Sequence, residues 1–156
     1  MSTNKLILKK MQIEAMEGEI KTHFLNSNAV RLNKSLGDAV GLSKIGVHMI
    51  YVEPGKDTTE YHKHLYEEEC IYVLSGQGKL TIEEQDFTLK KGDFVGFPAN
   101  TVAHALINNG SNTLICLIMG QRLEQDIADY PHQKKRLYRN SGEWNLVDLE
   151  NIVDIK

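Results

Sequence analysis

The sequence predicts an all-β fold, an antiparallel sandwich or barrel with an extension at each end. The middle of the chain is a succession of short β-type runs separated by Gly, Pro and Asn. Regular short strands with such turn residues between them are typical of antiparallel sandwiches and barrels. The 156 residues, 41% hydrophobic and 25% charged, amount to about one domain with a single hydrophobic core.

Five runs are expected to form strands or hairpins, and turn residues separate them. The run KLTIEEQDFTL contains a hairpin that turns near Glu84 to Asp86. No internal repeat or linker indicates a second domain, so we expect the barrel to span residues 41–120. In chain order the runs are KIGVHMIYVEPG, CIYVLSGQG, KLTIEEQDFTL, KKGDFVGFP and VAHALINNGSNTLICLIM.

The two ends of the chain are expected to be extensions that pack on the barrel, over residues 1–40 and 121–156. Near the N-terminus, Ile13, Met16 and Ile20 have helical spacing, but Gly18 weakens the pattern, and an extended arm is an equal alternative. The C-terminal extension is expected to cover one face of the barrel, anchored by Trp144.

Charge and apolar content argue against several classes of partner. The formal net charge of -3 and the pI near 6.1 give no long-range attraction to nucleic acid or to an anionic membrane. The longest apolar run, LICLIM, is far too short to cross a bilayer as a helix. The first sixteen residues do not have the pattern of a signal peptide. Cys70 and Cys116 lie in apolar runs, where reduced cysteine is a small buried hydrophobe, so we expect a reducing compartment, the cytoplasm.

The stretch EYHKHLYEEEC, residues 60–70, carries the first candidate site. A solvated charge run with surface histidines is one interpretation of it. On an extended strand, however, residues two apart point the same way, so His62 and His64 direct both imidazoles to one side. Glu69 then begins the next strand on the face that is expected to point inward, whereas Glu68 lies on the opposite face.

A third imidazole comes from the later run FPANTVAHALIN. His104 stands there on an otherwise apolar strand, and a buried histidine needs a partner. A core histidine with a satisfied hydrogen bond is the alternative. Three histidines and the carboxylate of Glu69 in one small barrel instead predict a metal site formed by His62, His64, Glu69 and His104. Such a ligand set accepts one divalent ion, whether zinc, nickel, iron, manganese or copper.

The order and spacing of these residues resemble the two motifs of the cupin superfamily. Gly55, His62, His64, Glu69 and Gly76 match the first motif, with one extra residue before His62.

The second motif is matched by Gly92, Pro98, His104 and Asn108, with Asn100 in place of a glycine and one extra residue before His104. Asparagine tolerates the left-handed backbone that glycine normally supplies, so the departure affects a turn and leaves the ligands intact.

Further stretches, among them SLGDAVGLSKIGVH and DYPHQKKRLYR, resemble a group of uncharacterised bacterial single-domain cupins. The resemblance implies a jelly-roll barrel, a double-stranded β-helix, with the four ligands around one divalent metal.

Two functions follow from such a centre. Four protein ligands leave room for water, substrate or dioxygen on an ion that retains positive charge, as in a dioxygenase, isomerase or lyase acting on a small oxygenated, sugar-like or carbonyl molecule. The alternative is a non-catalytic cupin that binds a sugar, a sugar phosphate or another small ligand. A metal that only holds the barrel closed would have neither function. Lys63 and Arg122 are candidate phosphate-binding cations. Candidates for a general base are Tyr61, Tyr66, Tyr72, His48 and Asn108.

The strands ECIYVL and LICLIM are apolar on both faces. A strand between a barrel interior and water should alternate with polar residues, so something must cover the outer face. The N-terminal arm is one candidate, but a partner subunit is the usual cover for a large apolar patch. We therefore expect a homodimer.

Overall fold

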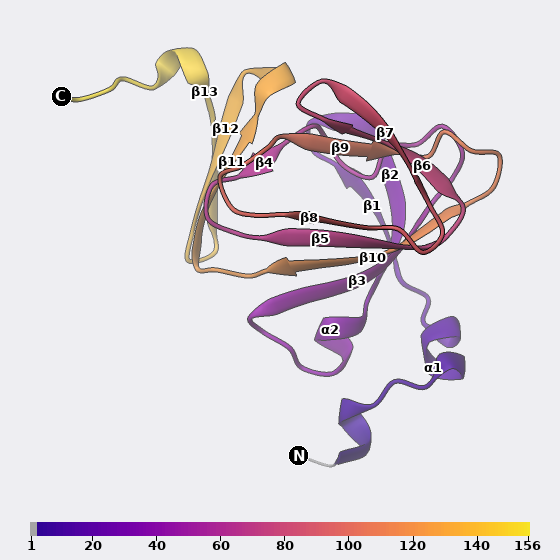
Figure 1. Ribbon diagram of the computed structural model, residues 1–156. Helices are drawn as coiled ribbons and strands as arrows, with labels where there is room; N and C mark the ends of the chain where they lie inside the picture. Colours follow the sequence, from indigo (N-terminus) through magenta and orange to yellow (C-terminus); the bar gives the residue numbers. More distant parts are fainter. Residues whose placement is uncertain (1–2) are drawn as a thin grey trace.

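Three antiparallel sheets make up the fold in a computed structural model, which describes residues 3–156 (Figure 1). The first two residues of the expected N-terminal extension lie outside this range. The largest sheet has the strand order β1-β2-β3-β10-β5-β8, and a smaller sheet has the order β7-β6-β9. The third sheet, β13-β12-β11-β4, joins the C-terminal strands to a short strand of the barrel.

Strands account for most of the chain, and the helices are short. No helix among residues 3–156 is long and apolar enough to span a membrane. The helical segments are η1 (Thr3–Leu6), α1 (Lys10–Ala15), α2 (Leu36–Ala39), η2 (Pro131–Gln133) and η3 (Leu149–Asn151). The strands are β1 (Glu19–His23), β2 (Asn26–Ser35), β3 (Ile45–Val52), β4 (Lys63–His64), β5 (Glu69–Ser75), β6 (Gln77–Ile82), β7 (Gln85–Lys90), β8 (Phe94–Phe97), β9 (His104–Ile107), β10 (Leu114–Gln121), β11 (Gln125–Tyr130), β12 (Lys135–Asn140) and β13 (Glu143–Asp148).

The main core lies between the six-stranded and the three-stranded sheets. Alternation along β5 buries Ile71 and Val73, and alternation along β10 buries Leu114 and Cys116. Burial of the inward side chains removes apolar surface from water, which is the main force that closes the two sheets on one another. The buried cluster consists of Ile50, Val52, Ile71, Val73, Leu80, Phe97, Leu106, Leu114 and Cys116.

Tight turns set the ends of the strands. Gly76 has φ 81°, and a Cβ there would lie 2.8 Å from the carbonyl oxygen of Thr113, so the turn requires glycine. Asn100 has φ 54°, which agrees with its expected role in place of a glycine. The β6–β7 hairpin turns at Glu83 and Glu84, slightly earlier than expected, and both residues have positive φ.

Both descriptions of the N-terminal extension hold in part. Ile13 lies in the short helix α1, but Ile20 does not, because the segment after the helix is extended and forms β1 and β2 of the largest sheet. The Lys34 side chain donates hydrogen bonds to the backbone carbonyls of Ile13 and Glu14, at 3.0 and 3.1 Å. Because Lys34 is on β2, these bonds tie the helix to the sheet.

The C-terminal extension forms β11, β12 and β13 beside the barrel. Its own buried cluster is Ala128, Tyr130 and Leu137. The expectation that Trp144 anchors it is wrong, because 58% of that side chain is exposed. Trp144 lies on β13, an edge strand that pairs only with β12 in its sheet, so no further strand covers it.

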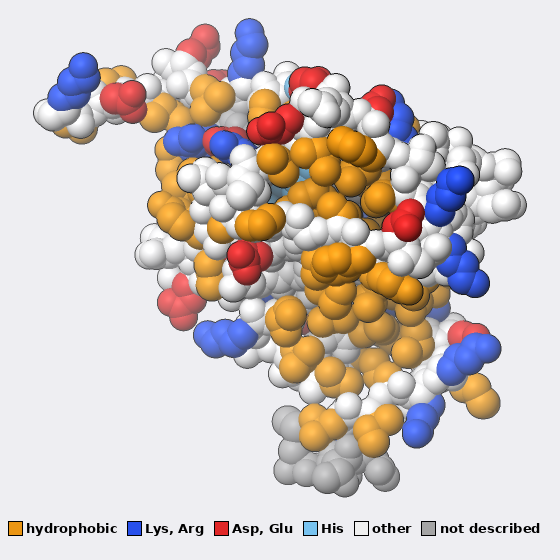
Figure 2. All heavy atoms as spheres, viewed as in Figure 1, with side chains coloured by type: hydrophobic (Ala, Val, Ile, Leu, Met, Phe, Trp, Pro, Cys, Tyr) orange, Lys and Arg blue, Asp and Glu red, His pale blue; other side chains and the backbone are white. Residues whose placement is uncertain are grey.

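The outer face of the six-stranded sheet carries a continuous apolar row. The register places Met49, Leu117, Tyr72 and Phe94 side by side across β3, β10, β5 and β8. The exposed fraction is 39% for Tyr72 and 62% for Phe94. Hydrophobic side chains gather in the middle of the view in Figure 2, over these strands. The sequence pattern of strands apolar on both faces is thus present in the fold.

Removal of bound metal should leave this fold intact. The main core contains none of the four expected ligands, so apolar burial alone should hold the sheets together. We expect chelator-treated protein to keep its far-ultraviolet circular dichroism and a cooperative thermal transition, at a lower midpoint because bound metal stabilises by mass action. Complete loss of structure in chelator at ordinary temperature would contradict this expectation.

Candidate metal centre

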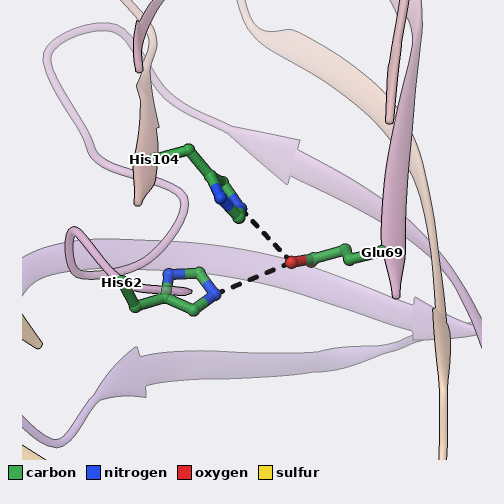
Figure 3. A group of neighbouring side chains, drawn as sticks. All are labelled: His62, Glu69 and His104. Atoms are coloured by element: carbon green, nitrogen blue, oxygen red, sulfur yellow. Dashed lines mark ion pairs between the residues drawn. The ribbon is translucent and has the colours of Figure 1, made fainter. Parts of the chain in front are cut away.

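Three of the expected ligands converge on one carboxylate oxygen. His62 precedes the short strand β4, Glu69 begins β5 and His104 begins β9. The Oε2 atom of Glu69 lies 3.6 Å from Nε2 of His62 and 3.3 Å from Nε2 of His104 (Figure 3). Both histidines are buried, and Glu69 is half-buried. These residues form a group whose ligand atoms all lie within 4.8 Å of one another.

The backbone holds the two histidines beside each other. His62 and His104 exchange two hydrogen bonds, from His62 N to His104 O at 3.1 Å and from His104 N to His62 O at 2.8 Å. Their ring centroids are 4.7 Å apart. The ring of Phe97 stacks on His104 with 3.4 Å between centroids, which restricts the orientation of that imidazole. The relative position of the two nitrogens therefore depends on strand pairing and packing.

The geometry and the donor types fit a divalent metal. Two ligands that are each about 2.1 Å from one ion, at tetrahedral or octahedral angles, are about 3.0 to 3.4 Å apart. The two separations from Glu69 are close to that range. In addition, Oε2 of Glu69 is buried and has no hydrogen-bond partner among the described residues. Buried polar atoms are normally satisfied, so an unpartnered carboxylate oxygen facing two imidazoles suits a binding site for a cation.

Protonation states also suit metal binding. Burial raises the pKa of Glu69, but His104 and His62 outweigh it and hold that pKa well below its usual range. Burial lowers the pKa of His104. The Nδ1 atom of His62 lies 2.8 Å from the carbonyl oxygen of Glu60, and a proton on Nδ1 donates to it and leaves a lone pair on Nε2. The centre then offers the Glu69 carboxylate, a His104 imidazole whose neutral form is favoured by burial, and the Nε2 lone pair of the His62 tautomer that donates to Glu60.

His64, the fourth expected ligand, lies beside this group but belongs to a second one. Its ring centroid is 5.0 Å from that of His62. Its Nδ1 atom is 2.6 Å from Oδ2 of Asp126 and 4.0 Å from the carboxylate of Glu67. Burial lowers the pKa of His64, but the hydrogen bond to Asp126 and the nearby carboxylates raise it by more. The pKa of His64 is therefore above its usual value. A proton shared between Nδ1 and Asp126 leaves Nε2 for a metal, so His64 as a ligand stays a prediction.

Sequence reasoning missed Glu67, Asp126 and Arg139. Glu67 is buried, accepts a hydrogen bond from the backbone of Leu123 at 2.7 Å and pairs with Arg139. Asp126 is 3% exposed and accepts hydrogen bonds from the backbone N–H groups of Tyr66 and Glu67, both at 3.2 Å. It also makes the hydrogen bond to His64. One signal existed, because Asp126 lies two and four residues before the apolar residues Ala128 and Tyr130 in QDIADY, and it therefore shares their inward face on β11.

A cavity of about 410 Å³ opens beside the candidate ligands. All four expected ligands line it, together with the cations Lys21, Arg31 and Arg139 and the exposed aromatic residues Phe24 and Trp144. Lys63 and Arg122, the phosphate-binding candidates from the sequence, do not line it, and Arg122 instead pairs with Asp38.

Among the five base candidates, only His48 lines this cavity. Its two ring nitrogens lie 3.3 Å from the Asn33 amide and 3.4 Å from the Arg122 guanidinium. Asn108 is fully buried, and its amide donates to two backbone carbonyls at 2.8 and 2.9 Å, which is a structural role. Tyr61, Tyr66 and Tyr72 lie outside the cavity wall.

Comparison with known proteins agrees with the fold and with the motifs. The family model described as "Cupin domain" matches residues 48–120. A crystal structure of a provisionally assigned sugar phosphate isomerase from Acidithiobacillus ferrooxidans is 58% identical, with a TM-score of 0.97 over 99% of each chain. The chain belongs to the cupin family. The jelly-roll barrel expected from the sequence is therefore confirmed.

Two further proteins are similar to this chain, one in its fold and one over part of its sequence. A sugar phosphate isomerase of the cupin superfamily from Silicibacter pomeroyi is 24% identical, with a TM-score of 0.78 over 88% of this chain and 91% of that one, which supports the fold alone. An uncharacterized protein of Methanocaldococcus jannaschii is 37% identical over 60 residues. That match covers 38% of this cupin and 47% of the archaeal protein, about half its length.

Substitution of the ligands should separate Glu69 from its neighbour Glu68. Alanine at His62, His64 or His104 is expected to remove bound metal, and Glu69→Gln to weaken binding, because each change removes a donor. Glu68→Gln is the matched control, since Glu68 is exposed and should leave the metal content unchanged. Elemental analysis of each purified variant measures the effect. Equal metal loss in Glu68→Gln and Glu69→Gln would show that the assigned ligand is wrong.

Asp126 should tune metal binding through His64. In Asp126→Asn, the partner of Nδ1 loses its charge, and metal affinity is expected to fall by about 10- to 100-fold. Competition with a chromophoric zinc chelator measures this affinity. Asp129→Asn is the control on the same strand, since Asp129 pairs with Arg136 and does not line the cavity. Unchanged affinity in a folded Asp126→Asn protein would show that His64 does not bind the metal.

Proposed function

We propose that this cupin is a metal-dependent enzyme that acts on a small sugar-like molecule, a sugar phosphate, and isomerises it. The observation that carries the proposal is the unpartnered carboxylate oxygen of Glu69 in the wall of an open cavity. A purely structural metal is normally enclosed by its protein ligands, whereas a catalytic metal keeps open positions. The cavity, at about 410 Å³, also has the size of typical small-molecule sites.

The residues of the chain would perform two tasks, and the bound ion would perform a third. His62, His104 and Glu69, with His64 as the expected fourth ligand, would hold the ion and leave positions that face the cavity. A bound divalent ion would supply Lewis acidity that polarises a carbonyl or hydroxyl oxygen of the substrate. The apolar and aromatic parts of the wall, such as Phe24 and Trp144, would exclude water from one side of the sugar and orient it.

The similarity to the Acidithiobacillus protein supports the choice of reaction class. That protein is provisionally assigned as a sugar phosphate isomerase, and 58% identity over 99% of both chains covers the extensions as well as the barrel. Dioxygenase and lyase chemistry would use the same open positions, but the relative that matches the whole chain at 58% identity is provisionally assigned to isomerisation. Isomerisation is therefore the proposal with support from both the site and a close relative.

We also propose the division of the chain into an N-terminal extension (1–40), a barrel (41–120) and a C-terminal extension (121–156) that together complete the site. Arg31 from the first extension and Asp126 from the last line the cavity with the barrel's histidines. The free thiols of Cys70 and Cys116 support location in the cytoplasm, a reducing compartment.

Solvent deuterium exchange would test the enzymatic proposal. An aldose–ketose isomerase that works by proton transfer releases the hydrogen on the carbon next to the carbonyl to solvent. We expect metal-loaded protein in deuterated water to exchange that hydrogen in at least one member of a panel of aldose and ketose phosphates, and to form the partner isomer, as followed by proton NMR. The Glu69→Gln variant should lose the activity, and Glu68→Gln should retain it.

Two other outcomes would count against the enzyme. Saturable binding of a sugar or sugar phosphate without exchange or conversion would favour the alternative, a non-catalytic sugar-binding cupin. Absence of both binding and exchange across the panel would reject a sugar phosphate as the ligand.

We further propose that this cupin is a homodimer joined through the outer face of the six-stranded sheet. The row formed by Met49, Leu117, Tyr72 and Phe94 crosses four strands, and its last two members are well exposed. Contiguous apolar patches on a soluble protein usually mark an interface, and a closed dimer would bury the same face of both subunits.

A charged substitution in this row would test the dimer. Light scattering should give twice the chain mass for the wild type at micromolar concentration, and Phe94→Glu should shift the mass towards that of one chain. Phe87→Glu is the control, because Phe87 is 47% exposed but lies on β7 in another sheet. A monomer mass for the wild type would refute the dimer.

A further inference from the structure

Among the arginines of the described residues, Arg31 is the one that makes no ion pair with a carboxylate. Arg122, Arg136 and Arg139 pair with Asp38, Asp129 and Glu67, respectively. Within residues 3–156, the Arg31 guanidinium makes no ion pair, and its hydrogen bond goes to the backbone carbonyl of Thr58. Because a guanidinium carries five N–H donors, most of its donor capacity is free.

Arg31 is nevertheless held inside the cavity. Its side chain is half-buried, lines the same cavity as His62, Glu69 and His104, and comes from β2. Burial lowers the pKa of Arg31, and the negative charge of Glu69 opposes this shift. A partly desolvated cation without a paired anion costs free energy, which a functional role would explain.

A second cation stands directly opposite. The register of β1 and β2 pairs Lys21 with Arg31, and both line the cavity. Like charges in directly opposed positions of an antiparallel pair are destabilising. Lys21 has an exposed partner, Glu19, at 3.4 Å, so it is partly neutralised, whereas Arg31 is not. Together they make the β1–β2 side of the cavity positive.

We propose that Arg31, assisted by Lys21, forms the phosphoryl-binding subsite of this cavity. The planar guanidinium matches the oxygens of a phosphate monoester in a bidentate arrangement. One end of a bound sugar phosphate then pairs with Arg31, and its sugar oxygens face the donors of His62, His104 and Glu69. The assignment rests on the proposed function for the identity of the substrate, but anion binding by Arg31 does not require any reaction.

Inorganic phosphate is the probe for this subsite. Calorimetric titration of metal-loaded wild-type protein should give saturable binding. In Arg31→Gln, phosphate affinity is expected to fall on the order of thirtyfold or more. This is the lower end of the losses observed when one partner of a buried, hydrogen-bonded charge pair is removed. Arg31→Lys keeps the charge without the fork and should lose about tenfold, a decisive second variant if Arg31→Gln does not fold.

Arg136→Gln is the matched control, because Arg136 is bound to Asp129 and does not line the cavity. Its phosphate affinity should equal that of the wild type. Phosphate held by the metal alone would bind equally well to folded Arg31→Gln and Arg31→Lys, and that result would overturn the subsite. Absence of phosphate binding to the wild type would also overturn it.

The two proposals fail in different ways. Arg31-dependent phosphate binding with neither deuterium exchange nor formation of the partner isomer would retain the subsite and reject the isomerase. Exchange that is equally fast in Arg31→Lys and wild type at low sugar phosphate concentration would retain the isomerase and reject the subsite. For an active enzyme, the expected signature of the subsite is a raised KM for the phosphorylated sugar in Arg31→Lys, with metal content unchanged.

Discussion

The candidate centre depends on the pair of backbone hydrogen bonds that His62 and His104 exchange. These bonds join the segment before β4 to the start of β9, two parts of the chain that are 42 residues apart in sequence, and they place two imidazoles side by side. Glu69 enters from β5 and brings one carboxylate oxygen within 3.3 and 3.6 Å of the two Nε2 atoms. Since strand pairing fixes all three starting points, the donors are arranged before any ion binds, which reduces the cost of ordering the ligands.

The extensions give this general barrel its particular cavity. The family model covers residues 48–120, but the Asp126 carboxylate on His64 and the Arg31 guanidinium come from outside that range. Ligand atoms for a cation therefore lie on the barrel side of the cavity. Cationic N–H groups that can bind an anion lie on the β1–β2 side. A molecule with oxygens at one end and a phosphoryl group at the other matches both parts of the wall. In this way, the same fold that serves many cupins would acquire its own substrate preference.

Local signals in the sequence predicted the fold well, but they could not predict contacts between residues that are far apart in the sequence. The positive φ of Asn100 and the inward alternation of Ile71 and Val73 depend on neighbouring residues, so a pattern reveals them. The bond from His64 to Asp126 spans 62 residues and depends on the register of β11 against β4, which no pattern sets. The exposure of Trp144 was missed for the same reason, because it depends on which strand ends the sheet.

Anomalous X-ray diffraction from crystals of the metal-loaded protein, recorded on both sides of the absorption edge of the metal, tests the central claim most directly. The account predicts one peak per chain, about 2.0 to 2.2 Å from Nε2 of His62, Nε2 of His104 and Oε2 of Glu69. The same map would show whether Nε2 of His64 completes the set. A saturated crystal with no peak at these atoms, or with its only peak elsewhere, would contradict the account.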